Sequence, residues 1–304
     1  MTQLQLPDCS ALIATALDED FAYGPDHTSI ATVPAAARCS AELNAREDGT
    51  IAGLGLLEAV LNTTASRLHR LGVELADDNC EIALHGADGQ QVYEGQSLAT
   101  ITANTRLVLA AERTMLNLIS HTSAIATETH RWVAAIAAEA NKEPGRRLVQ
   151  AGVRDTRKTL PGMRALQKYA VRAGGGVNHR MGLGDAAMIK DNHVLAAGGS
   201  VAEALRRVRA HNPEIACEVE VDTLDQLAEV LPLQPDMVLL DNFALADVHT
   251  AVQRRQALSP DTALEASGGL TLERAGAYGT SGVDYIAVGA LTHSVRVLDI
   301  GLDF

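Results

Sequence analysis

A short stretch of this sequence concentrates positive charge in a chain that is otherwise acidic. Between Arg154 and His193 there are eight Lys or Arg residues and three acids, whereas the whole chain of 304 residues has a formal net charge of -13. Cations that face one cavity repel each other unless an anion neutralises them, and guanidinium and ammonium groups bind carboxylates or phosphates by charge-assisted hydrogen bonds. The stretch therefore indicates a site for a polyanionic ligand.

The positions of these cations suggest two different roles. Arg164, Lys168 and Arg172 recur at a spacing of four in a helix expected to begin near Pro161, so they should share one outer, solvated stripe. The remaining candidates fall at expected strand ends or in loops, and side chains at the carboxyl ends of parallel strands converge on one face of a barrel. We therefore expect the ligand to contact Arg157, Lys158, His179, Arg180 and Lys190.

Acidic and small residues follow the later strands of the same half of the chain. Glu218, Glu220 and Asp222 alternate along one strand and share one of its faces. For Glu218 and Asp222, a structural salt bridge or a helix cap is as good an interpretation as a role in the site. Asp241-Asn242 and Ser267-Gly268-Gly269 each follow a further strand, and the glycines let the backbone approach a ligand closely.

The second half of the chain has the rhythm of parallel βαβ units, because short apolar runs alternate with helical segments beyond Arg147. Capping boxes at Ser200-x-x-Glu203 and Thr223-x-x-Gln226 mark two helix starts. Six strands are fewer than eight, so an incomplete α/β barrel is favoured over a closed one, and a doubly wound open sheet is the alternative. The expected strands are Leu148 to Val153, Ala186 to Ile189, Ile215 to Val221, Asp236 to Leu240, Thr262 to Ala266 and Asp284 to Val288.

The first half of the chain predicts a small α+β domain with an antiparallel sheet. Short β-prone runs alternate with turn signals over residues 38 to 104, and helices are expected at Ser10 to Leu17 and at Val60 to Leu71. From about Thr105 to Ala140 apolar residues recur at helical spacing, which predicts long helices that connect the two domains.

Bulk properties exclude several classes of protein. The net negative charge argues against non-specific nucleic-acid binding, which needs a basic surface. Four cysteines without metal-binding spacing are expected to be reduced, which predicts a cytoplasmic protein. We expect neither a membrane span nor a signal peptide, because no apolar run is long enough and the first 20 residues lack a basic start.

Several motifs together resemble the quinolinate phosphoribosyltransferases over most of the chain. The most specific run extends from residue 155 to residue 193, and shorter similarities flank it on both sides. The motifs are Ala45-Arg46-Glu47-Asp48-Gly49, Glu112-Arg113-Thr114, Asp155-Thr156-Arg157-Lys158-Thr159, Asn178-His179-Arg180-Met181-Gly182-Leu183, Ile189-Lys190-Asp191-Asn192-His193, Glu218-Val219-Glu220-Val221, Leu240-Asp241-Asn242-Phe243, Glu265-Ala266-Ser267-Gly268-Gly269 and Val288-Gly289-Ala290-Leu291-Thr292-His293.

The resemblance implies roles for particular residues. Lys158, Lys190, Glu220 and Asp241 would be catalytic, with Glu220 and Asp241 contacting the ribose and its Mg²⁺ directly or through water. Quinolinate would be bound by Arg113, Thr156, Arg157, Lys158, His179, Arg180 and Lys190. Phosphoribosyl pyrophosphate would be bound by Glu220, Asp241, Ser267, Gly268, Gly269, Gly289, Ala290 and His293.

The resemblance also implies an architecture and an assembly. A sandwich-like α+β domain, residues 1–118 with 294–304 packed back on it, would precede an open α/β barrel of the type II phosphoribosyltransferase kind, residues 119–293. The family forms obligate homodimers in which Arg113 would reach the site of the neighbouring subunit, and higher oligomers are left open. Departures from the family pattern are Leu160, Ala124 and an insert near Asn141 to Gly145, and none of them is an implied ligand.

The implied reaction is decarboxylating phosphoribosyl transfer to quinolinate in NAD synthesis. The pyridine nitrogen has its own lone pair, so its attack on the ribose needs no general base, and the alkylated nitrogen then accepts the electrons that carbon dioxide leaves behind. Three alternatives stay open at this point: a non-decarboxylating phosphoribosyltransferase, a barrel aldolase that uses Lys190 as a Schiff base, and an anion sensor without catalysis.

Overall fold

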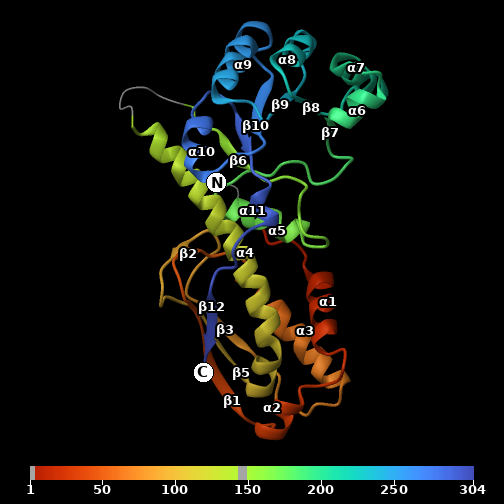
Figure 1. Ribbon diagram of the computed structural model, residues 1–304. Coiled ribbons are helices and arrows are strands. Elements are labelled where there is room, and N and C mark those ends of the chain that lie inside the picture. The colour runs from red at the N-terminus through yellow and green to blue at the C-terminus, as the bar shows by residue number, and fades with distance from the viewer. Residues whose placement is uncertain (1–3, 143–148) are drawn as a thin grey trace. The chain divides into compact units, whose positions relative to one another are not determined.

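Apolar strands that alternate with helices produce a parallel sheet in the second half of the chain. A computed structural model describes residues 4–142 and 149–304, which form two compact units (Figure 1). The first unit comprises the chain up to Glu128 together with Leu160–Gly175 and Ser294–Phe304, and the second comprises Thr129–Thr159 and Gly176–His293.

The second unit is built on six parallel strands. Their order is β6-β11-β10-β9-β8-β7, so the strands follow the sequence from one edge and the first strand lies beside the last. That order is the order of a barrel and rules out the doubly wound alternative, in which the order reverses within the sheet. The strands are β6 (Gly152–Arg154), β7 (Ala187–Ile189), β8 (Cys217–Val221), β9 (Met237–Asp241), β10 (Ala263–Ser267) and β11 (Tyr285–Ala287).

The barrel is incomplete between β6 and β7. Within the described residues these two strands do not pair, and the chain after residue 176 makes only a single parallel bridge there, between Val177 and Arg154. The prediction of an incomplete α/β barrel is therefore confirmed. Five of the six expected strands begin and end within about two residues of their predicted ends. The strand predicted from Leu148 begins only at Gly152, and Leu148 itself and most of the 141–145 insert lie outside the described residues.

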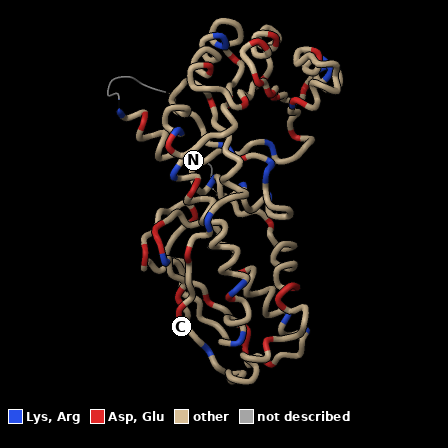
Figure 2. Tube along the Cα trace, in the orientation of Figure 1, with Lys and Arg blue, Asp and Glu red and all other residues tan. Residues whose placement is uncertain are grey.

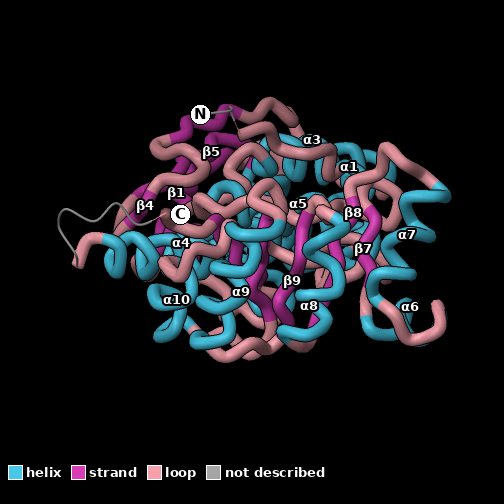
Figure 3. The backbone as a smooth tube through the Cα atoms, turned by 90° about the horizontal axis from the view of Figure 1, so that it is seen from above, coloured by secondary structure: helices cyan, strands magenta, loops and turns pink. Residues whose placement is uncertain are grey.

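Helices flank the strands of this unit, with α7 to α10 along one side of the sheet in Figure 3. The N-cap half of both predicted capping boxes forms: Ser200 Oγ accepts a hydrogen bond from Glu203 N (3.1 Å), and Thr223 Oγ1 accepts one from Gln226 N (3.2 Å). A short 3-10 helix, Leu231–Leu233, precedes β9. The helices are α6 (Asp191–Ala196), α7 (Val201–His211), α8 (Leu224–Val230), α9 (Leu245–Leu258), α10 (Leu272–Gly279) and α11 (Ala290–His293).

The first unit contains the expected antiparallel sheet, in the order β12-β1-β5-β3, and a small pair, β2 and β4. Its strands are β1 (Arg38–Ala45), β2 (Gly49–Thr50), β3 (Glu81–Leu84), β4 (Gln91–Val92), β5 (Ser97–Asn104) and β12 (Ile300–Asp303). Its helices are α1 (Ser10–Asp20), α2 (His27–Thr32), α3 (Leu56–Arg70), α5 (Arg164–Ala173) and the first part of α4 (Thr105–Ala140).

A single apolar core holds the first unit together. Val108, Ala111, Met115 and Ile119 recur at helical spacing on α4 and are buried in this core. The predicted group of long helices is thus one continuous helix of 36 residues, which begins in the first unit and ends in the second. None of the helices in the described part of the chain is both long and apolar enough to cross a membrane.

Helix α5 departs from the sequence analysis in two respects. Leu166 and Tyr169 pack into the core of the first unit, so residues 160–175 belong there and not to the second domain as expected. Lys168 is only 1% exposed, so the prediction that it lies on a solvated stripe with Arg164 and Arg172 is wrong. Because α5 is buried around most of its circumference, helical spacing alone did not identify a solvent-facing side.

Close packing between α10 and α4 in the second unit gives a stability prediction. A methyl group at Gly279 would lie 2.5 Å from Ile136 Cγ1, and Ile136 is buried. We expect Gly279→Ala to lower the free energy of unfolding by about 1–3 kcal/mol through overpacking. Ile136→Val in the same chain should restore part of the loss in a denaturant titration.

Gly184→Ala is the matched control, since no described atom lies within 4 Å of its added methyl group. Equal denaturation midpoints for Gly279→Ala and Gly184→Ala would contradict this account of the helix contact.

Candidate active site

A cavity of about 420 Å³ opens at the carboxyl ends of the strands in the second unit. Parallel strands bring their carboxyl ends together, so side chains that are distant in sequence meet there. Most of the predicted site residues from this unit line it. The lining residues are Thr156, Arg157, Lys158, His179, Arg180, Met188, Lys190, Glu220, Leu239, Asp241, Glu265, Ser267 and Ala287.

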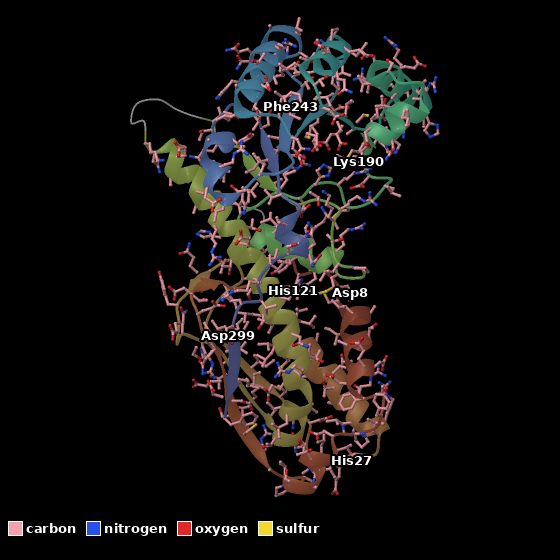
Figure 4. All side chains as sticks on the ribbon, viewed as in Figure 1. Asp8, His27, His121, Lys190, Phe243 and Asp299 are labelled. Carbon is pink, nitrogen blue, oxygen red and sulfur yellow. The ribbon has the colours of Figure 1, made fainter. Side chains whose placement is uncertain are left out.

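Four cations stand around this cavity. Burial and, to a smaller extent, electrostatic repulsion from the guanidinium of Arg157 lower the pKa of Arg180. The Nε atoms of Arg157 and Arg180 are buried and have no hydrogen-bond partner among the described residues. Lys190, labelled in Figure 4, follows β7, and its Nζ lies 2.5 Å from Glu220 Oε2. This local cluster contrasts with the predominance of acids in the chain as a whole (Figure 2).

The turn that carries Arg157 and Lys158 is fixed from both sides. Lys158 N donates to Thr156 Oγ1 (3.0 Å), and Thr292 Oγ1 donates to Lys158 O (3.0 Å). Gly289 lies against this turn, because a methyl group there would be 3.2 Å from Lys158 Cδ and 3.4 Å from His293 Nε2. Gly289 and His293 are thus next to the cavity, and Ala290 begins the short helix between them.

Two acids face the cations. Glu220 lies near the end of β8 and Asp241 is the last residue of β9, and both side chains line the cavity. Burial and the charge of Asp222 raise the pKa of Asp241, while Lys190 acts in the opposite direction. Asn242 Nδ2 donates to Asp241 Oδ2 (2.7 Å). The pair offers carboxylate oxygens beside ammonium groups, which suits a ligand that carries both hydroxyls and anionic groups.

The Ser267-Gly268-Gly269 segment makes a tight loop between β10 and α10. Gly268 and Gly269 have φ of +85° and +57°, a region that side chains disfavour. A methyl group at Gly268 would also collide with Asn242, whose backbone N would be 2.9 Å away. Asn242 N donates to Ser267 O (2.9 Å), which ties this loop to the end of β9. The loop has the free backbone approach expected of an anion-binding turn.

A layer of buried ionisable side chains lies next to the cavity, and the sequence analysis assigned no role to two of its members, Glu265 and Arg154. Glu265 is fully buried, accepts a hydrogen bond from Arg154 Nη1 (2.8 Å) and lies 3.7 Å from His179 Nε2. Glu218 is buried and its Oε2 lies 2.7 Å from His179 Nε2, so it contacts another side chain of the protein, which favours the structural interpretation of Glu218. Only the position of Glu265 on a strand was visible in the sequence, because a single acid in an apolar run gives no other signal.

Arg113 is not among these residues. It is exposed on α4 in the first unit, where it lines a different cavity of about 610 Å³ with Leu116, Asn117 and Met163. Its predicted role requires a second subunit, which the structure does not contain.

Comparison with known proteins agrees with the site geometry. A family model for the N-terminal domain of quinolinate phosphoribosyl transferase matches residues 26–123, and one for the C-terminal domain matches residues 125–303. The chain belongs to the quinolinate phosphoribosyl transferase family. Members of this family share the two-part division into an α+β unit and a parallel α/β unit that the structure shows.

Among its relatives, the chain is 53% identical to a nicotinate-nucleotide pyrophosphorylase (carboxylating) from Mycobacterium leprae, over 96% of this chain and 95% of the relative. It is 40% identical to a probable nicotinate-nucleotide pyrophosphorylase (carboxylating) of Bacillus subtilis, over 87% and 83%. The solved nicotinate-nucleotide pyrophosphorylase of Francisella tularensis superposes with a TM-score of 0.84 at 33% identity, covering 99% of this chain and 98% of that one.

The buried acid layer gives a pH prediction. Burial, and next the charge of Glu218, raise the pKa of Glu265 from 4.5 to about 8, although Arg154 opposes the shift and Asp155 adds to it. An acid with a raised pKa in the folded state binds its proton more tightly there, so its contribution to stability is present below pH 4.5 and is lost as pH rises towards 8.

Glu265→Gln abolishes this titration, so its free energy of unfolding relative to the unaltered protein should increase over that window. The increase is at most about 1.4 kcal/mol for each pH unit. Denaturant titrations at several pH values measure it, with the exposed Glu214→Gln as the control. A difference that stays constant from pH 5 to pH 8 would show that Glu265 does not hold the proton.

Proposed function

We propose that this protein is a quinolinate phosphoribosyltransferase that forms nicotinate mononucleotide, carbon dioxide and pyrophosphate from quinolinate and phosphoribosyl pyrophosphate. The observation that carries the proposal is the convergence of Arg157, Lys158, Arg180 and Lys190 with Glu220 and Asp241 in one cavity. The identity to carboxylating relatives over nearly the whole chain supports the same reaction. The product places the enzyme in NAD synthesis.

The cations serve the first requirement of this reaction, which is to bring two anions together. Quinolinate carries two carboxylates, and Arg157 and Arg180 have unpartnered buried Nε groups that can donate to them. We assign Arg157, Arg180 and Lys158 to the carboxylates, with Thr156 at the base of the same turn. Lys190 lines the same cavity as these residues and pairs with Glu220, so we assign it to the meeting point of the two substrates.

The acids act on the sugar. As pyrophosphate leaves, positive charge develops at the anomeric carbon, and Glu220 and Asp241 stabilise it electrostatically. The pyridine nitrogen attacks with its own lone pair, so the acids do not need to accept a proton in this step. The Ser267-Gly268-Gly269 loop after β10, with Gly289, Ala290 and His293 after the neighbouring strand β11, supplies backbone and side-chain donors for the 5-phosphate.

Magnesium fits the oxygen donors of this site. Mg²⁺ prefers carboxylate and phosphate oxygens. Burial and then the negative charge of Asp222 raise the pKa of Asp241, and a bound cation would favour the ionised form of this carboxylate. Glu220 and Asp241 would hold the ion directly or through water, and the ion would neutralise the pyrophosphate as it departs. A cytoplasmic site of action is also part of the proposal, supported by four cysteines that are all free.

Decarboxylation follows bond formation in this scheme. Once the ring nitrogen is alkylated it is cationic and accepts the electron pair from the bond to the departing carboxylate, and the ring carbon then takes up a proton. Met188, Leu239 and Ala287 add apolar side chains to the lining of the cavity. Poor solvation of a carboxylate beside them would favour its loss as carbon dioxide.

The test is incubation with Mg²⁺, phosphoribosyl pyrophosphate and either carboxyl-labelled quinolinate or nicotinate. We expect mononucleotide and labelled carbon dioxide in equal amounts from quinolinate only, and no carbon dioxide when phosphoribosyl pyrophosphate is omitted. Turnover of nicotinate alone would assign the protein to non-decarboxylating phosphoribosyltransferases.

Arg157→Gln should raise the KM for quinolinate by roughly 10- to 100-fold, because one charge-assisted hydrogen-bonding group is worth about 1.5–3 kcal/mol. The KM for phosphoribosyl pyrophosphate should change much less, which initial-rate kinetics with each substrate varied will show. Arg172→Gln, at an exposed position of α5, is the control. Equal losses for both substrates would move Arg157 out of the carboxylate site.

A homodimer with shared sites is also part of the proposal, since Arg113 is exposed and borders an apolar cavity of its own unit. At quinolinate concentrations well below the raised KM, Arg113→Gln and Arg157→Gln should each retain little activity alone. Mixed dimers contain one intact site, so unfolding and refolding the two together should restore about a quarter of the activity of the unaltered protein. Failure of the mixture to exceed either parent would place Arg113 in the site of its own subunit or outside any site.

A further inference from the structure

His179 has a different role from the one that the family resemblance implies. We propose that His179 is a positioning residue: its unprotonated Nδ1 accepts a hydrogen bond from the backbone of Arg180, Glu218 accepts one from Nε2–H, and neither ring nitrogen contacts the substrate. This inference rests on the proposed function, because it concerns how the quinolinate carboxylates are bound. Glu218, Glu265 and Arg154 complete the group of side chains that hold the imidazole.

The first observation concerns the Nδ1 atom of His179. The backbone N of Arg180 donates a hydrogen bond to it over 2.8 Å. A backbone N–H can only donate, so Nδ1 must accept and cannot carry a proton. An imidazolium has protons on both nitrogens, so the ring is neutral in this arrangement and its proton is on Nε2.

The second observation concerns Nε2. It lies 2.7 Å from Glu218 Oε2, in a place where the two side chains are only 6% and 8% exposed. The Nε2 proton is therefore donated to Glu218, and both ring nitrogens are committed to the protein. His179 lines the cavity with its ring carbons, so a substrate carboxylate finds no hydrogen-bond donor on it.

What His179 does position is the guanidinium that follows it. The Arg180 backbone is held by His179 Nδ1, and Arg180 Nη1 donates to Ala186 O over 2.8 Å. The His179 backbone is held in turn by the fully buried Asp155, whose Oδ1 accepts from His179 N over 3.0 Å. Arg180 is thereby fixed at both ends while its Nε still has no partner among the described residues.

The remaining atoms of the group explain why the arrangement is stable. Glu218 Oε1 and Glu265 Oε1 are both buried without a hydrogen-bond partner in the described structure, and the carboxylates lie within 4.8 Å of each other and of the His179 ring. A proton on Glu265 turns one of these two oxygens into a donor. A divalent cation could bridge the same atoms, but the guanidinium of Arg154 already lies against Glu265 and would repel it.

Two substitutions of Glu218 separate the positioning role from substrate binding. Gln presents an amide oxygen to Nε2–H and an amide N–H to Glu265, so Glu218→Gln should lower kcat/KM for quinolinate only about threefold. Glu218→Ala leaves the buried Nε2–H of His179 unpaired. It should therefore raise the KM for quinolinate by roughly 10- to 100-fold, with little change in the KM for phosphoribosyl pyrophosphate. Glu214→Gln and Glu214→Ala are controls on the exposed turn before β8.

If His179 instead bound the substrate as an imidazolium, it would need the negative charge of Glu218. Glu218→Gln would then be as damaging as Glu218→Ala, and that result would overturn the proposal. The double variant Glu218→Gln/Glu265→Gln should have a much lower kcat/KM for quinolinate than either single variant. Its two amide oxygens must face His179 and Arg154, so the two amide N–H groups are forced towards each other. If the double variant showed only the summed effects of the two single substitutions, that result would contradict the inferred proton on Glu265.

A spectroscopic measurement does not depend on activity or on tolerance of the substitutions. In protein labelled with ¹⁵N-histidine, the His179 signals are those that His179→Gln removes. We expect the Nε2–H tautomer at pH 7, unchanged when quinolinate is added. Two protonated nitrogens, or a shift to the imidazolium on addition of quinolinate, would refute the positioning role. Metal analysis showing a stoichiometric bound ion that Glu265→Gln removes would also do so.

These outcomes are separate from the proposed function. Formation of nicotinate mononucleotide by the unaltered protein decides the reaction, whereas the tautomer of His179 and the comparison of Gln with Ala at position 218 decide only how Arg180 is held.

Discussion

Repulsion between like charges is the constraint on which the arrangement of this site depends. The parallel strands deliver Arg157, Lys158, Arg180 and Lys190 to one cavity, and two unit charges 4 Å apart interact by about 4 kcal/mol at an effective dielectric constant near 20. The structure offsets part of this repulsion with Glu220 and Asp241 from the neighbouring strands β8 and β9. Substrate anions neutralise the remaining positive charge, so the charge distribution of the cavity is complementary to that of its ligands.

The acids are arranged in two layers that differ in burial. Glu220 and Asp241 face the cavity next to Lys190, where ionised carboxylates can act on a developing positive charge. Glu218 and Glu265 are buried next to His179 and Arg154, where an unpaired charge would be costly. The high pKa of Glu265 follows from this difference, and a neutral carboxylic acid can donate where a carboxylate only accepts. The same residue type therefore serves electrostatics in one layer and hydrogen-bond geometry in the other.

The sequence was sufficient to predict where the strands lie along the chain, but it did not predict how deeply individual side chains are buried in the barrel. Apolar β-branched runs and the caps at Ser200 and Thr223 define where elements begin, so the polar residues at strand ends could be assigned to one face. Alternation placed Glu218 and Glu220 on the same face of β8 without showing that only Glu220 reaches the open cavity. Lys168 was misplaced and Glu265 was missed for the same reason: burial depends on what packs against an element, and that contact is not encoded in local periodicity.

The chemistry of the first step explains why the buried histidine that lines this cavity, His179, can serve a structural role. An enzyme that removes a proton from its nucleophile needs a base with a free nitrogen or oxygen close to the reacting atom. The pyridine nitrogen needs none, because its lone pair is available throughout. His179 can therefore give Nδ1 to a backbone N–H and Nε2 to Glu218, and the gain is a fixed Arg180. Where catalysis consists of placing charges, a fixed guanidinium contributes more than a mobile base.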